Sequence, residues 1–452
     1  MDQYLVYGLG ISGISTAKTL ASLGNKVYIY DEKEKEKLTD TLNILEEWGC
    51  EYIKDFKSIL KKVDILVKSP GIPNTNPNIA KARAEGLEVI SDLELVTRLY
   101  PEREIIAITG TNGKTTTSSL MKEILLACGK KAKAIGNIGL GMLWELHEGN
   151  EDEVYIIECS SFQLDGIIHF KPHISAIINI TPDHLDWHGS FDEYYSSKKN
   201  IFKNQTQSDY CIMNVDDPSL KELEKEVPTN IIQVASRNPI HQGIQVKGDS
   251  IYAINDTIEE YIMKLKEIPL KGNHNRENVL ITLGISKALG LPIDKVVEGI
   301  RGFKAVEHRL EYVSTIKGIE FYNDSKGTNI DASIKAIKSF ESPIILLAGG
   351  YDKKIDLKPF FQAMDGKVKY MILFGDTREK FAKLSESFGL PYKIVENMEQ
   401  AIKVAFENSD DGDVVLLSPA SAAWGMYPNF EIRGRDFKDQ VRKLREENGK
   451  EI

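Results

Sequence analysis

Residues Ala107-Ile-Thr-Gly-Thr-Asn-Gly-Lys-Thr-Thr-Thr117 carry the strongest fold signal in this chain. They predict a buried strand, residues 105–109, that ends in a glycine turn and continues into a helix. Backbone N–H groups of such a turn converge on an anion, and the helix N-terminus adds positive potential. Lys114 can reach the terminal phosphates of a nucleotide, and the Thr115 hydroxyl can bind Mg²⁺. Ile108 replaces the outer glycine of the usual phosphate loop. A simple corner would not explain a lysine and three threonines behind the turn. The stretch therefore predicts an ATP site.

The composition is that of a globular protein with several domains. The chain has 452 residues, 42% hydrophobic and 27% charged, and a formal net charge of −10; this length suggests about three domains. The negative charge argues against a nucleic-acid surface and against anionic membranes. No apolar run approaches the roughly 20 residues of a membrane span, and the start does not resemble a secretory signal. Four scattered cysteines without a CxxC pair indicate free buried thiols in a cytoplasmic protein.

Residues 1–97 predict a Rossmann-like domain. A strand at 4–7 leads into Gly8-Leu-Gly10-Ile-Ser-Gly13, and a second strand at 27–30 ends at Asp31, close to the spacing at which an acid meets a ribose. A later strand ends in Lys68-Ser-Pro-Gly-Ile72, where a ligand crevice is expected. A lone glycine fingerprint is a weak signal, but this one has its strand, helix and acid.

Residues 98–303 predict a central P-loop ATPase-like α/β domain. A strand at 154–157 leads into Glu158-Cys-Ser-Ser-Phe-Gln163, and a strand at 174–180 leads into a second polar segment. Such positions, just after apolar parallel strands, are where α/β enzymes keep their sites. A helix expected over 194–202 carries Lys198, for which a surface position is the default interpretation.

Two histidines follow the second of these strands. His184 and His188 have the i,i+4 spacing that could hold zinc on a helix. Pro182 and Gly189 bracket them, so we expect a loop and His184 alone as the functional ligand. A structural histidine is the alternative.

Residues 304–452 predict a third unit, a Rossmann-like α/β domain. Its strand at 318–322 ends in Asn323-Asp-Ser-Lys-Gly-Thr-Asn329, and further buried strands are expected at 343–348 and 414–418. Phe437, Val441 and Leu444 have helical spacing in the tail and are interpreted as packing residues.

These motifs together resemble the Mur ligase family of bacterial cell-wall synthesis, over essentially the whole chain. The specific elements are Gly110–Thr116, Glu158–Gln163, His184–Gly189, His308-Arg309 and Asn323–Lys326, in this order. The family uses the shorter glycine turn, which accounts for Ile108. The chain is most similar to the branch that adds D-glutamate to UDP-N-acetylmuramoyl-L-alanine with ATP and two Mg²⁺ ions. The resemblance thus implies these small-molecule substrates, no nucleic-acid or membrane partner, and a cytoplasmic monomer.

The resemblance also assigns roles to individual residues. Catalytic roles are implied for Lys114, Glu158, His184 and Lys198, and metal binding for Thr115, Glu158, His184 and Lys198. The implied ATP contacts are Gly110, Thr111, Asn112, Gly113, Lys114, Thr115, Thr116, Asn275, Asn278, Arg309 and Asp324. The implied UDP-sugar contacts are Ser12, Asp31, Ser69, Gly71, Asn137, Ser160, Gln163 and His184. The implied amino-acid contacts are Lys326, Thr328, Lys353, Ser418 and Phe430.

Carbamylation of Lys198 is a further implication of the family. An ammonium would repel Mg²⁺, whereas a carbamate supplies the anionic oxygens that Mg²⁺ prefers.

Some positions depart from the family pattern, and other functions compete. Glu32 and Lys33 follow Asp31 where relatives often have Thr or Ser and then Arg, and Ala423 and Gly425 stand where Ser and Asp are more usual. A sibling ligase adding another amino acid is therefore an alternative. Folylpolyglutamate synthetases share the ATP core but lack the first domain. A nicotinamide-dependent oxidoreductase would leave the Gly110–Thr117 turn and Glu158 unexplained. A nucleotide-binding switch would not need the set of Glu158, His184 and Lys198 around a second substrate.

Overall fold

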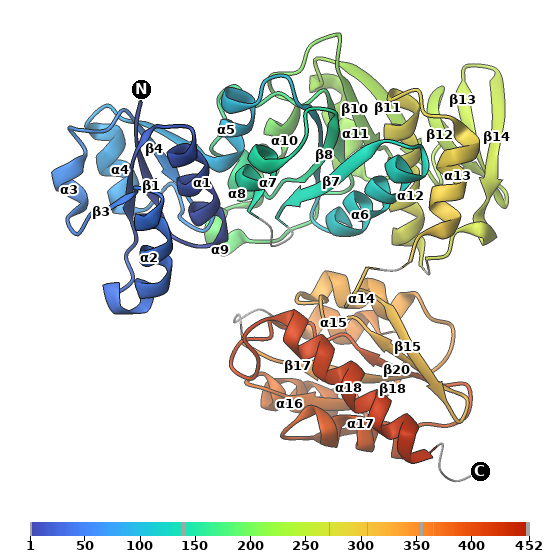
Figure 1. Ribbon diagram of the computed structural model, residues 1–452. Coiled ribbons are helices and arrows are strands. Elements are labelled where there is room, and N and C mark those ends of the chain that lie inside the picture. Colours follow the sequence, from blue (N-terminus) through green and yellow to red (C-terminus); the bar gives the residue numbers. More distant parts are fainter. Residues whose placement is uncertain are drawn as a thin grey trace. The chain divides into compact units, whose positions relative to one another are not determined.

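The computed structural model describes residues 2–137, 141–270, 272–304, 306–352, 356–364 and 366–448 (Figure 1). These residues form three sheets of five, nine and six strands. They divide into two compact units. The first comprises Met1–Ile268 and Glu277–Phe303, and the second comprises Pro269–Arg276 and Lys304–Ile452. The α/β character predicted for all three parts of the chain is confirmed.

The N-terminal sheet has the strand order β3-β2-β1-β4-β5, and all its strands are parallel. This is the order of a Rossmann fold. Gly8, at φ +93°, ends β1, and a side chain at Gly13 would overlap the Gly8 carbonyl oxygen. The two glycines therefore let the first helix start close to the strand. The strands are β1 (Gln3–Tyr7), β2 (Lys26–Tyr30), β3 (Glu51–Tyr52), β4 (Ile65–Lys68) and β5 (Glu88–Ser91); the helices are α1 (Ile11–Ser22), η1 (Lys35–Leu38), α2 (Thr39–Glu47), α3 (Phe56–Ile59), α4 (Pro77–Ala84) and α5 (Asp92–Leu99).

The central sheet has the order β14-β13-β12-β11-β10-β9-β6-β8-β7. Pairing is parallel from β7 to β12 and antiparallel beyond it. Its strands are β6 (Glu104–Thr109), β7 (Lys131–Gly136), β8 (Glu153–Glu158), β9 (Ile174–Ile177), β10 (Tyr210–Asn214), β11 (Asn230–Ala235), β12 (Gln242–Lys247), β13 (Ser250–Asn255) and β14 (Ile258–Lys264). Its helices are α6 (Lys114–Ala127), α7 (Met142–Glu148), α8 (Ser161–Leu164), α9 (Leu185–His188), α10 (Phe191–Lys199), η2 (Asn200–Phe202), α11 (Pro218–Leu223), η3 (Glu224–Glu226), η4 (Leu265–Glu267), α12 (Asn273–Ala288) and α13 (Ile293–Gly302).

Two local predictions for this sheet differ from the structure. The strand expected over 174–180 ends at Ile177. The segment expected to be a loop around the two histidines contains one helical turn, α9. His184 adopts φ +52° just before that turn, and Gly189 adopts φ +81° just after it, so the turn is confined to four residues.

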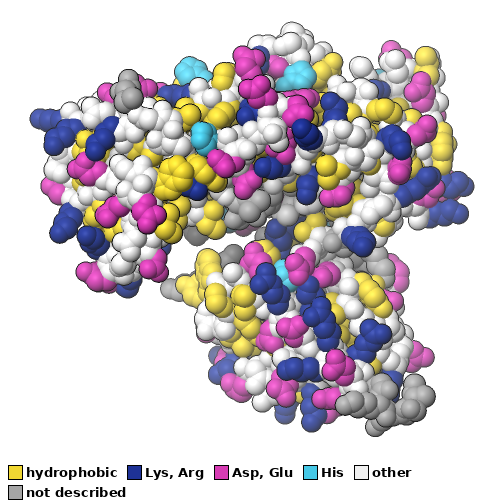
Figure 2. Space-filling model, in the orientation of Figure 1, with side chains coloured by type: hydrophobic (Ala, Val, Ile, Leu, Met, Phe, Trp, Pro, Cys, Tyr) yellow, Lys and Arg dark blue, Asp and Glu magenta, His cyan; other side chains and the backbone are white. Residues whose placement is uncertain are grey.

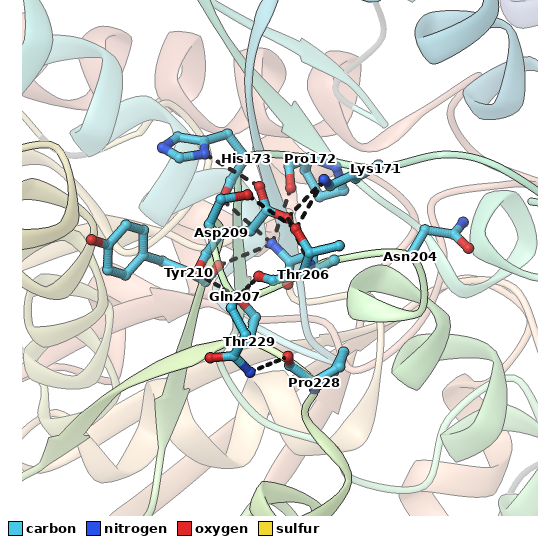
Figure 3. A network of polar contacts seen from close by, with 12 residues as sticks. Lys171, Pro172, His173, Asn204, Thr206, Gln207, Asp209, Tyr210, Pro228 and Thr229 are labelled. Atoms are coloured by element: carbon cyan, nitrogen blue, oxygen red, sulfur yellow. Dashed lines mark hydrogen bonds and ion pairs between the residues drawn. The ribbon is translucent and has the colours of Figure 1, made fainter.

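A polar network closes the amino-terminal ends of β9, β10 and β11 (Figure 3). Asp209 accepts hydrogen bonds from the Thr206 backbone N–H at 2.7 Å and pairs with Lys171 at 3.1 Å. The Thr229 hydroxyl donates to the Thr206 carbonyl oxygen at 2.6 Å. These groups satisfy one another, so the network is structural. It leaves the opposite, carboxyl-terminal edge of the parallel strands for chemistry.

The C-terminal sheet has the order β15-β16-β20-β17-β18-β19, and only its edge strand β15 is antiparallel among the described strands. Of the three residues predicted to pack, Phe437 and Val441 are fully buried against it, and Leu444 is partly buried against the same cluster. The strands are β15 (Glu311–Ile316), β16 (Ile319–Asn323), β17 (Ile344–Gly349), β18 (Val368–Phe374), β19 (Tyr392–Ile394) and β20 (Val414–Leu417); the helices are α14 (Ile330–Lys338), α15 (Lys358–Ala363), α16 (Arg378–Ser387), α17 (Met398–Glu407) and α18 (Phe430–Asn448).

The surface and the thiols complete this picture. On the face drawn in Figure 2, acidic and basic side chains are interspersed. None of the described helices is both long and apolar enough to cross a membrane.

Cys50, Cys159 and Cys211 are buried free thiols, but Cys128 is partly exposed, contrary to the expectation that all four are buried. The end of α6, where Cys128 lies, faces water on one side.

Candidate active site

The glycine turn at residues 110–113, called the ATP turn below, lies between β6 and α6, as predicted. Gly113 begins the helix at φ +91°, a left-handed conformation that favours glycine. Asn179, beyond the end of β9, holds the turn from the side: its Oδ1 accepts the Asn112 N–H at 2.9 Å, and its Nδ2 donates to the Asn112 carbonyl at 3.1 Å. A side chain at Gly113 would run into Asn278 of α12, so Asn278 lies directly on the turn. Thr115 and Thr116 are buried in the first helical turn, and Thr111 donates to the Thr181 carbonyl at 3.0 Å.

Two lysine amines meet at one carbonyl oxygen of this turn. Lys114 Nζ donates to the Gly110 oxygen at 2.8 Å, and Lys198 Nζ donates to the same oxygen at 2.9 Å. Lys198 is 2% exposed, so the default surface interpretation is wrong. Burial, and then the charge of Lys114, lower the pKa of Lys198 well below its ordinary value. The structure thus places a desolvated amine beside the lysine expected to bind phosphate.

Glu158 ends β8 with a buried carboxylate, 2% exposed. Its Oε1 accepts the Asn137 amide at 3.3 Å. Its Oε2 is buried without a hydrogen-bond partner among the described residues. Burying an unpaired charged oxygen is costly, so this atom fits a cation ligand. In the described part of the chain no three His, Cys, Asp or Glu side chains cluster to hold a metal. A cation at Glu158 would therefore need further oxygens, from hydroxyls or from a nucleotide.

The two histidines have different surroundings. The His188 ring nitrogens lie 3.0 Å from the Ser161 hydroxyl and 3.4 Å from the Ser197 hydroxyl. This ring is a packed, hydrogen-bonded element, which leaves no support for a zinc pair. The His184 side chain is 45% exposed, and its ring packs edge-on against Phe162 at 4.9 Å between centroids. His184 is therefore the accessible histidine of the two.

A cavity of about 190 Å³ opens where the N-terminal sheet meets the central sheet. It brings together three residues predicted to contact a UDP-sugar, Ser12, Asn137 and Gln163. Ser160 supports Gln163 through a capping box of α8. The cavity is lined by Ile11, Ser12, Pro70, Asp92, Gly136, Asn137, Met142 and Gln163.

Two of the other predicted UDP-sugar residues of the first domain, Asp31 and Ser69, order the glycine loop. Asp31 Oδ2 accepts the Leu9 N–H at 2.6 Å. The Ser69 hydroxyl donates to the Gly8 carbonyl at 2.7 Å. Gly71 faces open space. Asp31, Ser69 and Gly71 are not among the residues that line the cavity.

In the second unit, Arg309 and Asp324, which are predicted to contact ATP, lie at the carboxyl edge of the C-terminal sheet. Asp324 is 5% exposed; its carboxylate accepts the Ser418 hydroxyl at 2.7 Å and the Leu310 N–H at 3.3 Å. Burial raises the pKa of Asp324 to about 6, against the hydrogen bond from Ser418 and the charge of Arg309. The Arg309 Nε is buried without a hydrogen-bond partner among the described residues.

The predicted amino-acid contacts that belong to the described residues lie at the same edge. Lys326 Nζ is 5.4 Å from the centre of the Phe430 ring, and the Thr328 N–H donates to the Lys326 carbonyl at 2.8 Å. Asn275 belongs to this unit and is buried. Lys353 lies outside the described residues.

Two buried charges at the candidate sites were missed by sequence reasoning. Arg433, fully buried in α18, donates from Nε to the Ser325 hydroxyl at 3.0 Å and from Nη1 to the Ser421 carbonyl at 3.2 Å, and thereby ties two site loops together. It falls on the stripe of Phe437 and Val441, four and eight residues on, and a charge on an apolar stripe was the available signal. The second is Asp92, at the start of α5.

Comparisons with known proteins cover nearly the whole chain. Family models match residues 2–91 (Mur ligase MurD-like, N-terminal domain), 108–286 (Mur ligase middle domain) and 308–421 (Mur ligase, glutamate ligase domain). A UDP-N-acetylmuramoylalanine--D-glutamate ligase of Alkaliphilus oremlandii is 41% identical over 98% of both chains. One from Thermoanaerobacter sp. is 42% identical over 98% of both. The crystal structure of a UDP-N-acetylmuramate-alanine ligase from Thermotoga maritima has a TM-score of 0.61 at 19% identity and covers 98% of this chain and 100% of its own, which shows a shared fold.

Proposed function

The chain belongs to the Mur ligase family, and we propose that it joins D-glutamate to UDP-N-acetylmuramoyl-L-alanine with cleavage of ATP to ADP and phosphate. The observation that carries the proposal is the meeting of Lys114 and Lys198 at the Gly110 carbonyl in the ATP turn, in a chain similar over its full length to ligases of that name. The alternative of a nicotinamide-dependent oxidoreductase is wrong for a chain of this family.

The proposed chemistry activates a carboxylate. A carboxylate oxygen is a poor leaving group, so the γ-phosphoryl group of ATP is transferred to it and ADP departs. The amine of D-glutamate then attacks the acyl phosphate, the bond to the phosphate oxygen breaks, the amine loses a proton, and an amide remains. Lys114 neutralises charge on the transferred phosphoryl group, and the ordered turn positions it.

A bound Mg²⁺ would offset the charge of the nucleotide phosphates. The buried Oε2 of Glu158 fits such an ion, because an unpaired carboxylate oxygen is the kind of ligand Mg²⁺ prefers. Thr115, in the first turn of α6, and the accessible His184 are the other proposed ligands, for two ions in all.

Carbamylation of Lys198 is part of the proposal. The lysine ammonium first loses a proton, and the neutral amine then attacks carbon dioxide and releases a second proton, so that an anionic carbamate replaces a cation. The position of Lys198 supports this change, since two ammonium groups at one carbonyl oxygen repel each other. The carbamate would bind the second Mg²⁺ ion with His184.

The remaining assignments follow the three parts of the chain. We assign 1–97 to the UDP-sugar, 98–303 to ATP and 304–452 to the amino acid. Substrate roles for the individual residues stay as the resemblance implies. Free thiols suit a cytoplasmic enzyme, and we propose that it acts there as a monomer.

The test is phosphate release from ATP with Mg²⁺ and UDP-N-acetylmuramoyl-L-alanine, comparing D-glutamate with L-glutamate, L-alanine and L-lysine. Release that requires D-glutamate is expected. Release only with another amino acid would identify a sibling ligase, and Ala423 would then be the first residue to examine.

Lys198→Ala tests the carbamate. We expect it to abolish turnover and a small carboxylate to restore part of it. Lys199→Ala is the matched control, because the side chain of the neighbouring Lys199 is 37% exposed and pairs with Glu226. Full activity of Lys198→Ala without added carboxylate would contradict the assignment.

A further inference from the structure

Asp92 connects the two halves of the cavity wall. It is the first residue of α5, is 3% exposed, and lines the cavity together with Ser12 of α1 and Gln163 of α8. Its Oδ2 accepts a hydrogen bond from the Ser12 hydroxyl. The Gln163 Nε2 lies 3.3 Å from Oδ1 and 3.4 Å from Oδ2. One buried carboxylate thus contacts both side chains from different domains.

These contacts determine which way the two side chains present their polar atoms. A carboxylate only accepts, so the Ser12 hydroxyl must donate its proton to Asp92 and can offer only lone pairs to the cavity. The Gln163 amide is held at both ends: Nε2 faces Asp92, and Oε1 accepts the Ser160 N–H at 3.1 Å and hydroxyl at 3.0 Å. The amide cannot turn over without losing these bonds.

We propose that Asp92 is a positioning residue for the UDP-linked substrate, which it orients through Ser12 and Gln163 without being a catalytic residue. This inference rests on the proposed function, since it takes the cavity to hold that substrate. Burial raises the pKa of Asp92, and the hydrogen bonds from Ser12 and Gln163 oppose that shift. Removing the acceptor would free the Ser12 hydroxyl and the Gln163 amide to rotate.

The experiment measures KM for each of the three substrates in Asp92→Asn. Asparagine keeps one acceptor oxygen but replaces the other with an NH2 donor, so Ser12 and Gln163 cannot both keep their hydrogen bonds to residue 92. We expect KM for UDP-N-acetylmuramoyl-L-alanine to rise at least tenfold, while KM for ATP and D-glutamate stays within twofold. Asp165→Asn is the matched control, because Asp165 directly follows α8 but accepts from Asn74 instead; its KM values should stay within twofold of those of the unmodified chain.

A double-mutant cycle with Ser12→Ala separates positioning from general weakening. If Asp92 acts through Ser12, then Asp92→Asn must raise KM less in the Ser12→Ala background than alone. Equal effects in both backgrounds, or equal rises for all three substrates, would overturn the inference. If Asp92→Asn does not fold, Asp92→Glu is measured in the same way, and failure of both to fold marks a purely structural role and also overturns it. If phosphate release by the unmodified chain does not depend on UDP-N-acetylmuramoyl-L-alanine, the proposed function is refuted instead.

Discussion

Replacing the buried carboxylate of Glu94 should strongly destabilise the first unit. Glu94, two residues after Asp92 in α5, is fully buried. Its Oε2 accepts backbone N–H groups of Ile168 at 2.8 Å, His169 at 2.8 Å and Phe170 at 3.0 Å. Its Oε1 accepts the same His169 N–H at 3.0 Å and Arg98 Nε at 3.0 Å. The carboxylate therefore holds the loop after α8 onto α5.

The expected size follows from these contacts. In Glu94→Gln one oxygen becomes a donor, so either Arg98 or the backbone N–H groups lose their acceptor. Hydrogen bonds to charged groups are worth about 1.5–3 kcal/mol, and each buried donor left unpaired costs about 1–3 kcal/mol. We expect a loss of about 3–5 kcal/mol in the free energy of unfolding. Glu88→Gln is the control: Glu88 also pairs with Arg98, but its side chain is 37% exposed, so its loss should be about 0–1 kcal/mol.

The assay is urea unfolding followed by tryptophan fluorescence in a Trp424→Phe background. The other three tryptophans, Trp48, Trp144 and Trp187, all lie in the first unit, so the signal reports on that unit. A Glu94→Gln loss no larger than that of Glu88→Gln would refute the reasoning.

Three further predictions concern the loop, a buried acid and the proposed metal ligand. Gly13→Ala should lower the unfolding free energy by about 1–3 kcal/mol, because the new methyl group overlaps the Gly8 carbonyl, whereas Gly10→Ala, which meets no atom within 4 Å, should cost less than about 1 kcal/mol in the same urea assay; equal losses would contradict this. Burial raises the pKa of Asp324 from 3.8 to about 6, so its folded form favours the protonated acid. That stabilisation is present below pH 4 and is lost as pH rises through 6. The unfolding free energy relative to Asp324→Asn should therefore fall by about 2.5 kcal/mol between pH 4 and 7, and a pH-independent difference would disprove the cause given. Glu158→Gln should lower kcat about 10³-fold and raise the Mg²⁺ concentration needed for half-maximal phosphate release; an unchanged Mg²⁺ dependence would count against Glu158 as a ligand.

Much of the fold was predictable, because strands and turns are encoded locally. The glycine turn at 110–113 and the strand before it follow from adjacent residues, and so does the buried stripe of Phe437 and Val441. Strand ends were less predictable: β9 stops at Ile177 although the apolar Ile178 and Ile180 follow it, because pairing partners, and not hydrophobicity, set where a ladder ends.

The sequence by itself determined which chemistry-bearing residues follow which strands, since the order of strand, turn and polar segment is a property of neighbouring residues. Only the tertiary structure decided which residues these side chains contact. Lys198 has the local sequence of a surface helix, yet it is buried against the Gly110 carbonyl, 88 residues away in the chain. Asp92 reads as an ordinary first-turn acid but bridges Ser12 and Gln163. Burial and distant hydrogen bonds depend on how sheets and helices pack, and no local pattern records that packing.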